Sequence, residues 1–234
     1  MSEFLGTEQR RLLDAMDIDV WLPNAAAPGS EDAAPEEILS VPAEENPDWS
    51  ALESDVSACT RCVLHRTRRQ TVFGVGDQNA QWMVIGEAPG ADEDRQGEPF
   101  VGRAGQLLNE MLRAIGLSRQ HVYIANILKC RPPQNRNPKA EEVAQCLDFL
   151  RQQVALVRPQ LILAVGRIAA QNLLDDDQSV GRLRGRAHHF AVQDHSVPVV
   201  VTYHPAYLLR SPGQKRKAWD DLCFARSLSG APAA

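Results

Sequence analysis

The sequence lacks long apolar runs: none reaches roughly 18 residues, the length that predicts a membrane-spanning helix. The N-terminus also lacks a basic segment followed by an apolar one, which is the pattern of a secretory signal. We therefore expect a cytoplasmic protein that is neither exported nor inserted into a membrane.

Cysteine is scarce, and internal repeats are absent. In a reducing compartment, the five cysteines are expected as metal ligands or buried thiols rather than as disulfides. The chain has 234 residues, of which 44% are hydrophobic, so it can bury a sizeable core but is short for two full domains. One catalytic domain plus a tail is the expected organisation.

An excess of positive charge is also missing, which argues at first against a DNA partner. The formal net charge is −5, but the charge is unevenly distributed. Residues 1–55 hold fourteen acidic residues against Arg10 and Arg11, a net charge of −12, which leaves +7 on the rest of the chain. An acidic tail is therefore joined to a basic body that can bind a polyanion.

Composition divides the chain into three parts. Residues 1–50 are expected to form an acidic, mostly disordered tail, in which an amphipathic segment over residues 1–21 precedes a linker rich in Pro, Ala and Glu. The catalytic domain is expected over residues 51–228. Residues 229–234 are expected to form a flexible C-terminus.

Short apolar runs rich in β-branched residues predict four strands that are buried on both faces. These runs are Trp82–Gly86, Val122–Asn126, Leu161–Val165 and Pro198–Tyr203. Helical patterns cover Gly105–Ile115, Ala140–Val157, Ile168–Leu174 and Lys215–Ala225. The alternation predicts a three-layer α/β/α fold around a four-stranded, mainly parallel sheet, with ligands bound beyond the carboxyl ends of the strands.

Polar motifs follow three of these strands. The first strand runs into the acidic turn Gly86–Asp94, the second is followed by the loop Lys129–Arg136, and the last ends in Tyr203–Ala206. Acidic, amide and imidazole groups thus converge on one edge of the predicted sheet. A site that reads a base and cleaves a bond needs such groups.

Four motifs carry a resemblance to a known family. GEAPG at Gly86–Gly90, PFVG at Pro99–Gly102, KCRPP at Lys129–Pro133 and HPA at His204–Ala206 occur in the order and spacing of the thermostable-type, family-four uracil-DNA glycosylases. The chain resembles that family over residues 59–225. The resemblance implies the uracil-DNA glycosylase-like version of the fold. It also implies a base-excision repair enzyme that flips uracil out of DNA and hydrolyses its N-glycosidic bond, leaving an abasic site.

The resemblance implies roles for the residues at matching positions. Glu87 is the catalytic acid that helps to place or activate water, and His204 stabilises charge that develops on uracil O2 as the bond breaks. Phe100 stacks on the extruded uracil. Asn126 hydrogen-bonds O4 and N3–H, the edge that distinguishes uracil from cytosine.

Further positions follow from the same resemblance. Glu93 and Asn135 line the pocket, and Ala88 stands where other branches of the superfamily carry an acid, so more of the catalytic work falls on Glu87 or on leaving-group stabilisation. Leu208 matches the wedge that fills the gap left by the flipped base. Taken singly, each residue also has an ordinary structural explanation, as a core, capping or solvated side chain, and only their combination favours a site.

Four of the five cysteines have the spacing of a metal site. Cys59-x-x-Cys62 precedes the first strand, Cys130 lies in the KCRPP loop, and Cys146 lies on the next helix. Four thiolates suit either a structural zinc ion or a [4Fe–4S] cluster, and composition does not choose between them. The resemblance implies the cluster. Cys223 has no place in this pattern and is expected to be a buried thiol on the last helix.

Arginines flank the same elements, in loops where DNA phosphates are expected. They are Arg61, Arg66, Arg68, Arg69, Arg131, Arg136, Arg182, Arg184, Arg186 and Arg210. No lysine in the matching motifs is an obvious Schiff-base nucleophile, which predicts a monofunctional glycosylase without a lyase step.

Two other functions are open. A covalently trapping branch of the superfamily carries an Arg-Arg-Ile-His loop where this chain has Arg131–Asn135, and the missing histidine argues against covalent capture. The chain could instead be a catalytically weak DNA-binding accessory factor associated with the replication machinery. Turnover on an oligonucleotide that contains uracil separates this function from a glycosylase.

The tail suggests a protein partner. The segment Leu12–Trp21 resembles the N-terminal peptide of the psi subunit of the bacterial replicase clamp loader, which docks on the chi subunit. Residues 1–21 are therefore expected to contact a replication or repair protein, and the alternative is that they pack on their own body. The enzyme itself is expected to act as a monomer on DNA.

Overall fold

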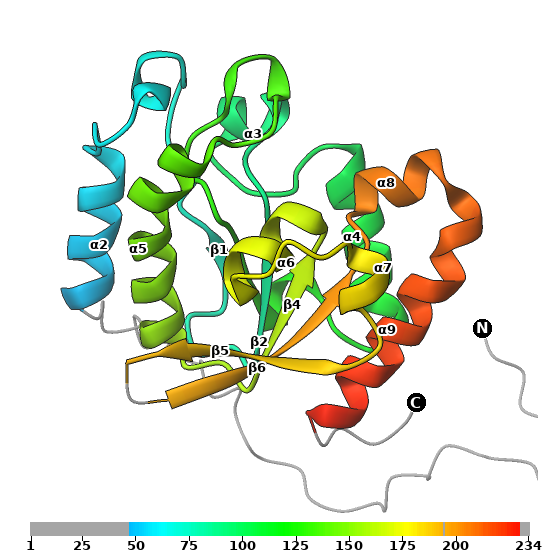
Figure 1. The fold of residues 1–234 in the computed structure, drawn as a ribbon. Coiled ribbons are helices and arrows are strands. Elements are labelled where there is room, and N and C mark those ends of the chain that lie inside the picture. The colour runs from blue at the N-terminus through cyan, green and yellow to red at the C-terminus, as the bar shows by residue number, and fades with distance from the viewer. Residues whose placement is uncertain (1–46, 194, 230–234) are drawn as a thin grey trace, which may run out of the picture. The chain divides into compact units, whose positions relative to one another are not determined.

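The computed structural model describes residues 47–193 and 195–229, drawn in colour in Figure 1. These residues belong to the second of two units into which the chain divides, residues 44–234. The amphipathic segment predicted over residues 1–21 lies outside the described residues. The linker predicted after it also lies outside them, except for Pro47.

The described residues form one mixed sheet of six strands. The strands are β1 (Val75–Gly76), β2 (Trp82–Gly86), β3 (Val122–Asn126), β4 (Leu161–Val165), β5 (Ala187–Val192) and β6 (His195–Thr202). In the order β1-β3-β2-β4-β6-β5, the four inner strands run parallel and the two edge strands pair antiparallel. The inner strands are the four that the sequence predicts.

The sequence predicts four strands, and the structure has two more, the edge strands β1 and β5. Strands β2, β3 and β4 have the predicted bounds because every residue in them is buried, which produces a continuous apolar run. Strand β6 begins three residues earlier than predicted, at His195. Strand β1 has only two residues, and β5 has only two buried residues, Phe190 and Val192, so neither produces such a run.

The four predicted helical segments are present, with ends that differ from the predictions by at most three residues. They are α4 (Arg103–Ala114), α5 (Ala140–Val157), α6 (Arg167–Leu174) and α9 (Lys215–Leu228). The helices that the sequence did not predict are α2 (Pro47–Ser57), α3 (Ala91–Gln96), α7 (Val180–Leu183) and α8 (Pro205–Arg210). No helix in the described part of the chain is long and apolar enough to cross a membrane.

Helices cover both faces of the sheet, which confirms the three-layer fold (Figure 1). Side chains of β2 alternate between two cores, as the period of a strand requires. Met83 and Ile85 pack in the core that α2, α5 and α6 cover, whereas Trp82 and Val84 pack in the core beneath α4 and α9. The parallel strands are thus buried on both sides.

Helix α2 begins inside the predicted tail and belongs to the core. The indole of Trp49 lies 5.8 Å from the ring of Phe73 and 5.3 Å from the ring of Tyr123. Trp49 is 6% exposed, and Leu52 is also buried. The predicted domain start at residue 51 therefore falls within this helix.

The prediction that Cys223 is buried is wrong, because this thiol is exposed on α9. The buried positions of α9 are Ala218, Asp221, Leu222 and Ala225, which recur at intervals of one helical turn. Cys223 lies one position beyond that stripe.

Candidate active site

A cavity of about 560 Å³ lies at the edge of the sheet where β2, β3 and β6 end. The helices α3 and α8 contribute to its wall and lie at the same end of the molecule (Figure 1). The predicted site residues that line the cavity are Glu87, Ala88, Glu93, Phe100, Asn126, Asn135 and His204. Segments far apart in the sequence therefore meet there.

The floor of the cavity is formed where Asn126 ends β3, paired in register with Gly86 of β2. A Cβ atom at Gly86 would lie 2.4 Å from Asn126 Oδ1 and 2.5 Å from the Phe100 ring, so glycine is required for this close approach. Asn126 is 2% exposed, and its Oδ1 has no hydrogen-bond partner among the described residues. A buried acceptor of this kind favours a ligand that brings a donor.

Phe100 presents an aromatic ring beside Asn126 and His204. Its φ angle is 55°, a left-handed conformation that costs about 1–3 kcal/mol for a bulky residue. The side chain is 7% exposed, and its ring centroid lies 5.7 Å from that of His204, tilted by 31°. The surrounding structure holds the backbone in this conformation.

Glu93 organises the wall through the main chain. Its Oε1 accepts hydrogen bonds from the amides of Val101 (3.0 Å) and Gly102 (3.2 Å), and its Oε2 accepts one from Gly90 (3.1 Å). One carboxylate thus ties the turn after β2 to the segment that carries Phe100. The structure places Glu93 at the cavity, as the sequence predicts, with its oxygens engaged by these amides.

His204 stands at the N-cap of α8, where the amide of Ala206 donates a hydrogen bond to its Nδ1 (3.1 Å). Because an amide can only donate, Nδ1 carries no proton, and the neutral ring has its proton on Nε2. Burial, assisted by the cation of Arg210, lowers the pKa of His204 to about 4, against an opposing effect of Glu93. The imidazole is therefore neutral at pH 7 and has an N–H to donate.

Glu87 follows β2 directly and is half-buried. Burial raises the pKa of its carboxyl above the usual range, and the positive charge of Arg167 opposes that shift. The neighbouring Ala88 also lines the cavity, and its methyl group packs against the core beneath α5. Glu87 thus presents a half-buried carboxyl group to the cavity.

Asn135 lies at the exposed rim of the cavity, on a short 3₁₀ turn over Pro133–Asn135. Its φ angle is 54°, which asparagine tolerates better than most residues. Arg131 Nε donates a hydrogen bond to its Oδ1 at 2.7 Å. This contact fixes the orientation of the amide.

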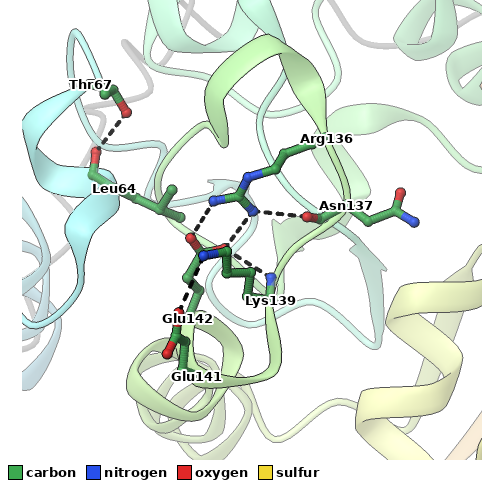
Figure 2. A network of polar contacts seen from close by, with 7 residues as sticks. All are labelled: Leu64, Thr67, Arg136, Asn137, Lys139, Glu141 and Glu142. Atoms are coloured by element: carbon green, nitrogen blue, oxygen red, sulfur yellow. Dashed lines mark hydrogen bonds and ion pairs between the residues drawn. The ribbon is translucent and has the colours of Figure 1, made fainter.

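The loop that carries Asn135 is anchored by an ion pair with α5. Figure 2 shows the guanidinium of Arg136 facing the carboxylate of Glu142, with N···O distances of 2.9 and 2.5 Å. The amide of Lys139 donates to the same carboxylate at 2.9 Å. The Glu142 side chain is fully buried, and these hydrogen bonds, Arg136 foremost, lower the pKa of its carboxyl.

Leu208, predicted as a DNA wedge, lies on the inward face of α8. Leu208 is 1% exposed and packs in the core beneath α4 and α9. The exposed apolar side chains of that helix are Tyr207 and Leu209.

The four cysteines predicted as ligands line a second, small cavity between α2, the KCRPP loop and α5. Cys59 and Cys62 are half-buried, whereas Cys130 and Cys146 are buried. Arg68 Nη1 lies 3.0 Å from Cys130 Sγ, and the Lys129 amide donates to Cys146 Sγ at 3.2 Å.

The local environment acts on these sulfur atoms in two opposing ways. Burial raises the pKa of the Cys146 thiol to about 11 and also raises that of Cys130, while the cations of Lys129 and Arg68 act in the opposite direction. Within the described ranges, no group of three or more His, Cys, Asp and Glu side chains is arranged to hold a metal ion.

Like Arg136, both Arg184 and Arg68 were expected at DNA phosphates and have partners within the protein. Arg184 pairs with the fully buried Asp221 at 2.8 Å and is 18% exposed at its side chain. Arg68 is held between Cys130 and the main-chain oxygen of Ser57. Their charges therefore stabilise the fold or the cysteine cavity.

Comparison with known proteins identifies the family. Residues 73–223 match the model of the uracil DNA glycosylase superfamily. The chain is 47% identical to the type-4 uracil-DNA glycosylase of Archaeoglobus fulgidus over 180 residues, which are 75% of this chain and 90% of the relative. The chain belongs to the type-4 uracil-DNA glycosylases. Identity is 43% to the Thermotoga maritima member, covering 74% of this chain and 90% of the relative, and 40% to the Pyrobaculum aerophilum member, covering 76% and 92%.

This type-4 family member has residues that line the pocket or act on its lining and that the sequence did not reveal. The positive charge of Arg167 opposes the rise in the pKa of Glu87. The sequence contains a signal for this contact, because Arg167 follows β4 at the same edge of the sheet. Tyr207 lines the cavity and stacks on Tyr203 with ring centroids 5.2 Å apart. Arg119 contacts the Phe100 main chain across 19 positions of sequence, and no pattern in the sequence indicates that contact.

Proposed function

We propose that this protein excises uracil from DNA in base-excision repair, hydrolysing the N-glycosidic bond and leaving an abasic site. The observation that carries the proposal is the buried, unpaired Oδ1 of Asn126, which lies beside an aromatic ring and a neutral histidine in one cavity. The names of the family relatives support the same activity for this chain.

Recognition of the base rests on the Asn126 amide. Its Oδ1 accepts a hydrogen bond from uracil N3–H, and its Nδ2 donates one to O4. Cytosine presents the reverse arrangement, an acceptor at N3 and a donor at N4, so a fixed amide discriminates between the two bases. Phe100 supplies the surface on which the extruded base stacks.

The chemistry requires charge stabilisation on uracil and a placed water. As the N1–C1′ bond breaks, its electron pair leaves with uracil, and the Nε2–H of His204 donates to the negative O2. The oxygen of water bonds to C1′, and the Glu87 carboxylate accepts the water proton. The positive charge of Arg167 favours the ionised form of Glu87 that this step needs.

The test uses an oligonucleotide with a single uracil, treated with hot alkali after incubation. The wild-type protein and Cys223→Ser, whose thiol is exposed and remote from the cavity lining, should produce alkali-labile strands, whereas Asn126→Ala should not. Borohydride should trap no covalent adduct, because the cavity lining contains no lysine among the described residues. Retained DNA binding without turnover would instead favour the accessory-factor alternative.

We propose further that Cys59, Cys62, Cys130 and Cys146 hold a [4Fe–4S] cluster. The residues fit, because four thiols line one cavity and two of them receive N–H groups that suit thiolates. Four thiols suit zinc as well as a cluster, and the resemblance to the type-4 family favours the cluster. When bound, the cluster supplies an anionic cross-link between the segment after α2 and the loop after β3.

Further proposals concern the N-terminal tail, the oligomeric state and the cellular location of the protein. We propose that the protein is cytoplasmic and monomeric and that residues 1–21 contact a replication or repair protein. A pull-down compares the full chain, a chain that begins at Pro47, and Trp21→Ala against chi and single-strand-binding protein. Equal capture of all three proteins, or lost turnover in the truncated one, would remove the docking proposal.

A further inference from the structure

The backbone around Phe100 is held from both sides. Arg119 Nη1 donates to the main-chain oxygen of Phe100 at 3.3 Å, and Nη2 donates to that of Pro99. From the other side, Glu93 accepts the amides of Val101 and Gly102. The peptide groups before and after Phe100 are therefore both fixed by side chains.

The Phe100 carbonyl has little freedom to turn. A Cβ atom at Gly105 would lie 1.7 Å from the Phe100 oxygen, so this carbonyl packs against the first turn of α4. Rotating φ of Phe100 from 55° to a negative value would turn its peptide groups away from Arg119 and Glu93. The left-handed conformation and the two side-chain contacts therefore depend on each other.

Arg119 is built into this position. Its side chain is 23% exposed and lies 3.9 Å from Glu98, which is exposed. It forms part of the 3₁₀ turn Arg119–His121 that leads directly into β3, whose last residue is Asn126. The segment from Arg119 to Asn126 thus begins with the residue that supports the Phe100 ring and ends with the amide that reads the base. The forked guanidinium can reach two carbonyls at once, which a lysine ammonium on a flexible stem does less well.

We propose that Arg119 is a positioning residue for uracil excision, because it holds Phe100 in the left-handed conformation that aims its ring into the base pocket. Arg119 does not line the cavity and acts only through Phe100. The inference rests on the proposed function for its kinetic consequence, and on the structure alone for its effect on the backbone.

A double-mutant cycle tests the proposal. Arg119→Met should lower kcat/KM on a uracil-containing oligonucleotide by about 10- to 100-fold, the range expected for a misplaced active-site group. In a Phe100→Ala background the same change should have almost no effect, because the ring that Arg119 positions is gone. Arg119→Lys should recover part of the loss. Arg113→Met is the matched control, since Arg113 is an exposed arginine of α4 that pairs with the exposed Glu110, and it should keep wild-type kcat/KM.

Further measurements separate the possible failures. Inhibition by free uracil should weaken in Arg119→Met by a similar factor, since the product occupies the same stacking surface. Equal losses from Arg119→Met in the wild-type and Phe100→Ala backgrounds would overturn the proposal. If Arg119→Met does not fold, Arg119→Lys is the variant that tests the proposal. A wild-type kcat/KM in Arg119→Lys would then overturn the proposal.

A crystal structure of the Arg119 variant without DNA tests the backbone claim independently of activity. The proposal expects Phe100 to adopt a negative φ or to lose its ordered ring position. An unchanged left-handed Phe100 in the variant would refute the positioning role. A wild-type protein that releases no uracil would refute the proposed function and leave this structural test standing.

Discussion

The ammonium of Lys129 lies 3.0 Å from the main-chain oxygen of Asn126, and the amide of the same lysine donates to Cys146 Sγ at 3.2 Å. Lys129 is 1% exposed, and its Nζ also donates to Gln153 Oε1 at 2.5 Å. One buried residue therefore joins the end of β3, where Asn126 lines the base pocket, to the cavity lined by cysteines. Because the Lys129 side chain is buried, its hydrogen bonds help to hold the end of β3 in shape.

Replacing Lys129 by Met should destabilise the protein. The change leaves the acceptors of Asn126 and Gln153 without their donor, which costs roughly 1–3 kcal/mol for each, partly offset because a buried ammonium is removed. Urea unfolding measures the loss, and Lys217→Met on the exposed surface of α9 is the control. Equal unfolding free energies for the two variants would contradict a structural role for the Lys129 hydrogen bonds.

Asn126→Asp should blunt the preference for uracil. A carboxylate cannot donate to O4, and when ionised it favours the amino group of cytosine, so discrimination can fall by on the order of 10⁴ in favourable cases. Paired oligonucleotides with one uracil or one cytosine at the same position measure the ratio of kcat/KM. Asn79→Asp, at an exposed turn, is the control. An unchanged ratio in the Asn126 variant would rule out the assigned reading role.

The sequence predicts the inner sheet well because burial on both faces leaves a direct trace in the chain. Strands β2, β3 and β4 begin and end where their apolar runs do. Strand β5 leaves no such trace, because it is an edge strand with mixed exposure. Helix α2 was missed because its amphipathic pattern is weak, although Trp49 and Leu52 anchor it in the core.

Site residues were predictable where a motif fixes both the residue and its place after a strand. Asn126 ends a strand and Glu87 and His204 follow strand ends, so their convergence follows from a parallel sheet. Leu208 shows the limit of that reasoning, because an offset of four residues does not determine which face of α8 points inward. The contact of Arg119 with Phe100 depends on how two loops pack, which no local pattern encodes.

The stability contribution of His204 should depend on pH in a defined window. Its folded pKa is about 4, below the value of about 6.5 for an unfolded histidine, so the unfolded state binds more protons between these values. Stability should therefore be complete above pH 6.5 and decrease as the pH falls toward 4. The difference in unfolding free energy between wild type and His204→Gln should shrink over that interval. A difference independent of pH would contradict a neutral, buried imidazole.

Arg167→Gln should move the acid limb of the pH–activity profile to higher pH. Burial already raises the pKa of Glu87, and removing the opposing positive charge raises it further, so more alkaline conditions are needed to ionise the carboxylate. Measurement of kcat/KM across the acid range gives the midpoint of the limb. Arg113→Gln, on the exposed face of α4, should leave that midpoint unchanged. A limb that does not move in Arg167→Gln would show that ionisation of Glu87 does not control the rate.

Replacing a cysteine of the second cavity by serine should remove the cluster and much of the stability. Cys59 and Cys62 come from the segment after α2, whereas Cys130 and Cys146 come from the loop after β3 and from α5, so a shared cluster closes a loop of more than sixty residues. Anaerobically purified wild-type protein should be brown and hold four iron atoms per chain, and Cys130→Ser should be colourless and melt at a lower temperature. Cys223→Ser is the matched control and should keep both colour and melting temperature, because its thiol is exposed on α9.

The loop that holds Asn135 starts at Cys130 and is also tied to α5 by Arg136 and Glu142. Excision should therefore fall in Cys130→Ser, while the ion pair in Figure 2 keeps part of the loop in place. A colourless wild-type protein with one tightly bound zinc would refute the cluster, and iron retained in Cys130→Ser would refute this ligand.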